Sequence, residues 1–177
     1  MTKNNIQKNK GYTLLFSVLI SSLLLTIGLA ILMISKKELL LSSSGRESQF
    51  AFYAADTGVE CAMYSDFGVN GGAFSDKTNS PPLLKCNGQN SIKPTGPSIV
   101  SSPPNTDTVE FTFKVTLDQS GNASLPLPCA FVTVDKQYSK DPGTPLLKTT
   151  IQSRGYNTGC DVTTDPRKVE RGLRVAY

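Results

Sequence analysis

The chain of 177 residues contains no histidine, and none of its four cysteines belongs to a Cys-x-x-Cys pair. Imidazole is the commonest protein ligand for transition metals and the most frequent general base. The absence of histidine therefore argues against a typical transition-metal site and against an active site with a histidine base. The cysteine spacing also argues against a zinc site and against thioredoxin-like redox chemistry. Because no nucleophile motif and no glycine-rich phosphate loop occur either, the sequence predicts no enzyme, no cofactor and no metal site.

Acidic residues are absent from the first ten positions, which carry the three lysines Lys3, Lys8 and Lys10. The net charge of the whole chain is +4, so the part after this basic leader keeps only about one positive charge. A nearly neutral body gives no electrostatic argument for nucleic acid, and none is predicted as a partner.

Charged residues are also missing from every position between Lys10 and Lys36. As a helix, this apolar segment spans about 36 Å, which exceeds the roughly 30 Å hydrocarbon core of a bilayer. The positive-inside rule places the lysine-rich residues 1–10 in the cytoplasm and the C-terminal part outside. The sequence therefore predicts a single-pass cytoplasmic membrane protein whose helix crosses the bilayer over residues 12–35.

Two other interpretations of the apolar segment are a buried core helix and a cleaved secretory signal. The core helix of a soluble protein would need the remaining residues to cover all of its faces. A cleaved secretory signal is the stronger competitor, because Gly28-Leu29-Ala30 imitates a small-x-small cleavage site. The apolar run nevertheless continues past that site through residues 31–34, further than an ordinary signal needs.

No proline precedes Pro81, so nothing forces the helix to end at the membrane surface. Beyond the apolar segment, small or apolar residues recur at helical spacing of three and four, at Phe52, Ala55, Val59 and Ala62. These patterns predict one long helix from about Tyr12 to about Asp66, with residues 36–66 as its soluble half. The run Ser42-Ser43-Ser44-Gly45 consists of poor helix formers, so we expect a bend or local melting there, and a break into two helices stays open.

The part of the sequence after residue 66 predicts a β-rich domain. Residues 67–108 are rich in Pro, Gly, Ser and Asn and are expected to form a long loop. Residues 109–177 contain four strand candidates, of which the first alternates most clearly between apolar and polar positions. The expected fold class is α+β, a long N-terminal helix packed on a four-stranded antiparallel sheet. The four expected strands are 109–117, 129–138, 147–156 and 169–177.

The even number of cysteines in an exported domain indicates two disulfides formed in an oxidising compartment. A hairpin folded about Gly143 would place Cys129 within reach of Cys160, which leaves Cys61 to pair with Cys86. Four cysteines allow three connectivities, and the sequence alone does not decide among them.

The first part of the chain resembles the type IV pilin-like proteins. Lys10-Gly11-Tyr12-Thr13-Leu14-Leu15 is similar to a prepilin processing site, in which a basic leader ends at a glycine directly before the apolar helix. The run Ala51-Phe52-Tyr53-Ala54-Ala55 resembles the alanine-rich signature of PilX-type minor pilins. The resemblance covers about the first 66 residues in sequence and the rest only in layout.

This resemblance implies a leader of residues 1–11, cleavage between Gly11 and Tyr12 by a membrane prepilin peptidase, and N-methylation of the new terminus. It further implies a pilin-like fold and partners that include other pilin subunits, bound through the N-terminal helix, and an inner-membrane assembly platform. The subunit would leave the membrane for an extracellular pilus or a periplasmic pseudopilus.

Phe16 departs from the family pattern. Pilins of the filament shaft usually carry glutamate at the fifth mature position, whose proposed partner is the terminal amine of a neighbouring subunit. Phe16 cannot accept that amine. The departure indicates a minor subunit that lies near the tip or initiates assembly, as in secretion pseudopili, where the tip subunit also lacks this glutamate.

Scattered charged residues in the β-rich part have simpler interpretations. The carboxylates of Asp135, Asp141, Asp161 and Asp165 lack a calcium-loop spacing and are expected to be solvated turn residues. The basic residues of the second hairpin are expected to face water as well, and they are Lys136, Lys140, Lys148 and Arg154.

Two alternatives to a pilus subunit stay open. The chain can be a singly anchored exported binding protein, in which the helix is only a tether, or an enzyme held at the membrane. The pilin interpretation predicts a mature N-terminus at Tyr12, whereas a plain anchor would retain residues 1–11.

Overall fold

The protein is described from a computed structural model, which covers residues 10–68, 72–75, 79–100, 106–117, 127–139 and 146–177. The chain divides into two units, Met1–Ser44 and Gly45–Tyr177. The fold class is α+β, with one long N-terminal helix and antiparallel sheets.

Helix α1 runs without interruption from Lys10 to Asp66. It begins two residues before the expected start and ends at the expected residue. The expected melting at residues 42–45 is wrong, because all four positions are helical. The boundary between the two units nevertheless falls at this point, between Ser44 and Gly45.

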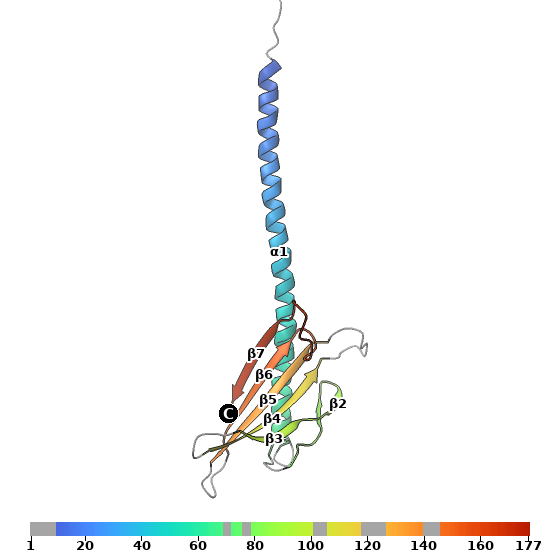
Figure 1. The fold of residues 1–177 in the computed structure, drawn as a ribbon, viewed down its shortest axis with the longest axis vertical. Helices are drawn as coiled ribbons and strands as arrows, with labels where there is room; N and C mark the ends of the chain where they lie inside the picture. The colour runs from blue at the N-terminus through green and yellow to red at the C-terminus, as the bar shows by residue number, and fades with distance from the viewer. Residues whose placement is uncertain (1–9, 69–71, 76–78, 101–105, 118–126, 140–145) are drawn as a thin grey trace, which may run out of the picture. The chain divides into compact units, whose positions relative to one another are not determined.

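The sheet of the second unit has five strands, so the expected count of four was wrong. Its antiparallel strands follow one another in the order β3-β4-β5-β6-β7 and lie side by side in Figure 1. Four of them match the expected strands to within three residues at each end. The strands are β3 (Thr95–Val100), β4 (Thr106–Thr116), β5 (Cys129–Ser139), β6 (Leu146–Tyr156) and β7 (Glu170–Ala176).

The fifth strand, β3, and a further hairpin lie in the region that was expected to be a loop. Strands β1 (Leu84–Cys86) and β2 (Gln89–Ile92) form a separate two-stranded antiparallel sheet. Their turn is Asn87-Gly88, in which both residues have positive φ, of 48° and 74°. Asn-Gly between two short strands is the typical sequence of a two-residue hairpin turn, and this signal identifies the hairpin.

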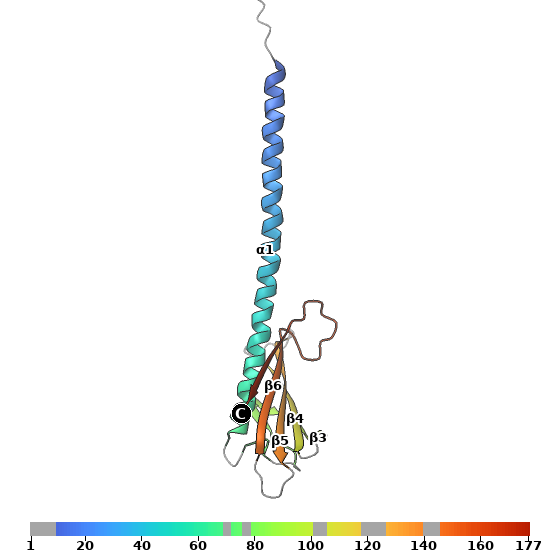
Figure 2. The same ribbon diagram turned by 90° about the vertical axis from the view of Figure 1, so that its left-hand side faces the viewer.

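One face of the five-stranded sheet packs against helix residues 45–66 (Figure 2). Small residues make this approach close, because Ala51, Ala54, Ala55 and Ala62 are fully buried. A Cβ atom added at Gly155 of β6 would collide with the backbone of the helix at Ala51 and Ala55. These alanines and Val59 therefore form the sheet-facing stripe of the helix, whereas Phe52, which was expected in that stripe, is exposed.

Aromatic side chains fill the core at the end of the helix. After Asp66 the chain turns back, and the amide of Ala73 donates to the carbonyl of Ser65 at 2.8 Å. The turn places Phe74, which is fully buried, against Phe111 and Phe113 of β4 at ring centroid distances of 5.3 and 6.0 Å. Burying Phe74 holds the segment that follows the helix onto the sheet.

Candidate functional site

The predicted processing site lies in the first turn of helix α1. Gly11 is the second residue of the helix, and Tyr12 follows with an exposed side chain. The first turn of a helix has no intrahelical partners for its amide groups and frays readily. Gly11 and Tyr12 are therefore at a position where local opening costs little, as proteolysis requires.

The apolar surface that begins at Tyr12 is exposed throughout the first unit. Every residue from Tyr12 to Ser44 is exposed in the isolated chain, and the helix is long and apolar enough to cross a membrane. Phe16 belongs to this surface and stacks on Tyr12, with ring centroids 6.4 Å apart. An apolar surface of this size needs a covering of lipid or of other protein.

Four polar side chains of the apolar segment are hydrogen-bonded within the helix itself. The hydroxyls of Ser17, Ser21, Ser22 and Thr26 each donate to a backbone carbonyl three or four residues earlier, at 2.8–2.9 Å. A hydroxyl bonded in this way can enter a bilayer without leaving an unpaired donor. These hydroxyls therefore do not prevent the segment from spanning a membrane.

A buried ion pair fixes the other end of the helix. The ammonium of Lys136 on β5 lies 2.5 Å from the carboxylate of Asp66, the last helical residue, and both side chains are about 95% buried. The hydroxyl of Tyr177 donates to the second carboxylate oxygen of Asp66 at 2.7 Å. Three chain segments that are distant in sequence meet at this carboxylate.

Lys136 contradicts the expectation that the basic residues of the second hairpin face water. The apolar alternation of β5 runs through Ala130, Val132 and Val134, all fully buried, so the next position of the same face is Lys136. That period-two pattern was the signal in the sequence that could have identified a buried lysine.

Tyr177 should make folding stability depend on pH in the alkaline range. Burial, followed by the hydrogen bond to Asp66, raises the pKa of Tyr177 above its ordinary value of 10.0. The unfolded chain therefore ionises first, and the stability due to this phenol is complete below about pH 10 and is lost at higher pH. We expect Tyr177→Phe to cost about 1 kcal/mol near neutral pH and less above pH 10. Urea titrations of both chains across this range test it, and a constant difference would contradict it.

The structure brings the four cysteines together as Cys61–Cys86 and Cys129–Cys160, with Cα atoms 5.7 and 5.4 Å apart. These distances lie within the normal range for disulfides, and the pairs are those favoured by the hairpin argument. The first pair links helix α1 to β1, and the second links the start of β5 to the segment after β6. Two disulfides are typical of a domain in an oxidising compartment.

The segment between β6 and β7 is tied back to the helix. The amide group of Asn157 donates to the Glu47 carboxylate at 2.7 Å, and just beyond the segment Arg171 of β7 donates to Ser48 at 2.8 Å. Inside the segment, the ammonium of Lys168 donates to the carbonyls of Cys160 and Val162. The segment therefore has fixed contacts at both ends. The sequence reasoning did not anticipate them.

The aspartates considered as calcium ligands do not converge. Asp161 pairs with Lys114, and the Asp165 carboxylate accepts from the amide of Arg167. Asp135 lies within β5, where burial raises its pKa and Arg174 partly opposes the shift. Asp141 lies outside the described residues, and within the described ranges no three His, Cys, Asp or Glu side chains could share a metal ion.

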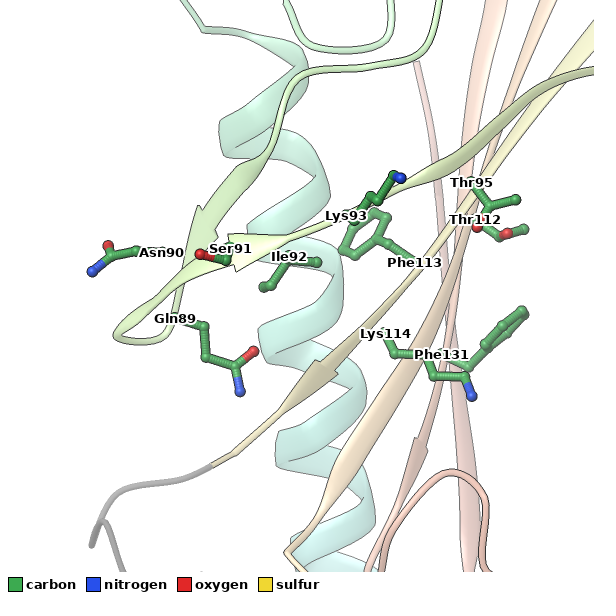
Figure 3. A pocket seen from close by; sticks show the side chains of 10 residues that line it. All are labelled: Gln89, Asn90, Ser91, Ile92, Lys93, Thr95, Thr112, Phe113, Lys114 and Phe131. Carbon is green, nitrogen blue, oxygen red and sulfur yellow. The ribbon is translucent and has the colours of Figure 1, made fainter.

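A polar pocket of about 530 Å³ opens between the β1–β2 hairpin and the edge of the large sheet. Figure 3 shows Gln89, Asn90 and Ser91 on the hairpin side and Thr112, Lys114 and Phe131 on the sheet side. Its lining contains two lysines, and among the described residues no acid, histidine or cysteine lines it. It offers groups for binding a ligand.

Comparisons with protein-family models, with curated proteins and with solved structures found no match to the chain.

Proposed function

We propose that the chain is a structural minor subunit of a type IV pilus or pseudopilus, positioned near the tip or acting when assembly begins. The observation that carries the proposal is the single helix Lys10–Asp66, whose first half is apolar and exposed and whose second half packs on an antiparallel sheet. A plain membrane tether does not require one helix to serve both as the span and as a core element of the exported domain.

The apolar half of this helix can move from a bilayer into a filament without entering water. In the bilayer the apolar half contacts lipid, and in a filament the apolar helices of neighbouring subunits would replace that lipid. The subunit then moves between two apolar surroundings, and the exposed leucines and isoleucines need not enter water. The internally bonded hydroxyls of Ser17, Ser21 and Thr26 add no unpaired group in either state.

Phe16 supports a minor role. A buried carboxylate at this position would need a positive partner in the bundle, and an exposed phenylalanine offers only apolar contact. A subunit of this kind fits a place in the filament where one charge pair is absent, such as the tip.

Processing of the leader tests the proposal. When the chain is expressed with a prepilin peptidase, we expect it to lose residues 1–11, and Gly11→Val to block this loss because the bulky side chain occupies the cleavage position. Gly28→Val is the matched control, since a Cβ at Gly28 meets nothing within 4 Å and the substitution leaves the leader intact. Intact mass before and after peptidase expression reports the result.

Equal processing of the Gly11→Val chain and the original chain would count against the proposal. Retention of the leader in every chain would favour the singly anchored binding protein, for which the polar pocket beside the β1–β2 hairpin provides a binding surface.

A further inference from the structure

The pocket beside the β1–β2 hairpin combines an aromatic ring with polar groups on several sides. Phe131 on β5 forms part of the wall formed by the sheet, and its register partners are Lys114 on β4 and Arg154 on β6. The guanidinium of Arg154 lies 5.9 Å from the centre of the Phe131 ring. The ring therefore has cationic side chains on both neighbouring strands.

Hydrogen-bonding groups line other parts of the same pocket. The amides of Gln89 and Asn90 and the hydroxyl of Ser91 come from the hairpin, and the hydroxyls of Thr95 and Thr112 come from the sheet (Figure 3). Gln89 is held in place by a hydrogen bond from its amide to the Thr116 hydroxyl. Amides and hydroxyls can each accept as well as donate, which suits a ligand that carries many hydroxyl groups.

The charge of the lining is positive. Lys93 and Lys114 line the pocket, and no acid does so in the part of the chain that the structure describes. Lys114 pairs with Asp161, but both side chains are exposed, at 47% and 84%, so the pair is weak and an anionic ligand can compete with it. Lys93 lies between the hairpin and the sheet with its side chain exposed, and no ion pair of Lys93 occurs among the described residues.

These features together select a class of ligand. A sugar ring presents C–H groups on one face, which pack on an aromatic side chain, and hydroxyls around its rim. A carboxylate on that ring would form charge-assisted hydrogen bonds with a lysine ammonium. The pocket volume of about 530 Å³ lies within the range of small-molecule sites, which hold roughly 300–1,000 Å³.

We propose that this pocket binds the carboxylated sugar units of an acidic polysaccharide, with Phe131 under one sugar ring, Lys93 on a carboxylate and the polar groups of the hairpin on the hydroxyls of a neighbouring unit. The inference deepens the proposed function, on which it rests for the placement of the pocket at a filament surface. The binding itself depends only on residues of the second unit.

The experiment measures binding of a galacturonic acid trimer to the full chain in detergent micelles by calorimetry. We expect binding in the original chain, a loss of about tenfold or more in affinity for Lys93→Ala, and a similar loss for Phe131→Leu. Lys85→Ala is the matched control, because Lys85 is an exposed lysine of the same hairpin that does not line the pocket, and it should leave the affinity unchanged.

Three results would overturn the inference. They are absence of binding, an equal loss for Lys85→Ala and Lys93→Ala, and equal affinity for the trimer and its uncharged methyl ester. A single-stranded DNA oligonucleotide and inorganic phosphate serve as further probes. If Lys93→Ala lowered the affinity for these anions as much as for the sugar, the pocket would be a general anion site instead. If the chain binds the sugar but keeps its leader, the proposed binding site stands and the proposed pilus function fails. If the chain loses its leader but does not bind the sugar, the pilus function stands and the binding site fails.

Discussion

Asp66→Ala should lower the free energy of unfolding of the second unit by about 3–5 kcal/mol, because it leaves the ammonium of Lys136 buried without its counter-charge. Both side chains are about 95% buried, so water cannot solvate the remaining charge. The substitution also removes the acceptor of the Tyr177 hydroxyl. Chemical denaturation in detergent micelles, followed by near-UV circular dichroism, measures the change.

The matched control removes both charges together. Asp66→Leu combined with Lys136→Met replaces the pair by apolar side chains of similar length, and such replacements are often neutral or stabilising. We therefore expect the double variant to be more stable than Asp66→Ala by several kcal/mol. If Asp66→Ala and the original chain unfolded at the same denaturant concentration, the buried pair would not be what holds the end of the helix to β5.

Gly155→Ala should destabilise the second unit by about 3 kcal/mol, the upper part of the range for overpacked cores. The added Cβ would overlap the carbonyl oxygen of Ala51 and the amide nitrogen of Ala55, and a helix backbone cannot yield as a side-chain tip can. Helix and sheet must separate to make room. The same denaturation experiment reports the loss.

Gly172→Ala provides the comparison within the same sheet. Gly172 pairs with Arg154 on the neighbouring strand, and a Cβ there meets nothing within 4 Å. This variant should keep the stability of the original chain or gain slightly, since alanine restricts the unfolded chain more than glycine does. Equal losses at positions 155 and 172 would show that the close helix–sheet approach is not the cause.

The prediction of one long helix was correct, although residues 42–45 suggested that it would melt or bend there. Residues 42–45 are poor helix formers, yet the helix passes through them, because propensity costs of about 0.5 kcal/mol for each serine and about 1 kcal/mol for Gly45 are small beside the rest of a long helix. The end at Asp66 was predictable, since the glycine and asparagine residues that follow are strong stop signals.

Strand β3 could not be predicted in the same way. It contains Gly96 and Pro97, which ordinarily exclude a strand, and its place at the edge of the sheet makes both acceptable. Gly96 has φ of 121°, and a Cβ there would lie 2.7 Å from the carbonyl oxygen of Glu110 on β4. The pairing therefore depends on a partner strand that local propensity does not include.

The buried charges were missed for a related reason. Asp66 was interpreted only as the end of the helix, and Lys136 only as one of several basic hairpin residues. Neither residue type is unusual at its position in the sequence. The two side chains are buried because the end of the helix packs against a strand seventy residues away. The polar pocket likewise needs the register of β4 and β5 and the missed hairpin.

The most direct test of the account is the N-terminal residue of the chain recovered from filaments sheared from cells that express it. The account predicts a chain that begins at Tyr12 with a methylated amine and that is absent from filaments when Gly11 is replaced by valine. A chain found only in the membrane fraction, and still beginning at Met1, would contradict it.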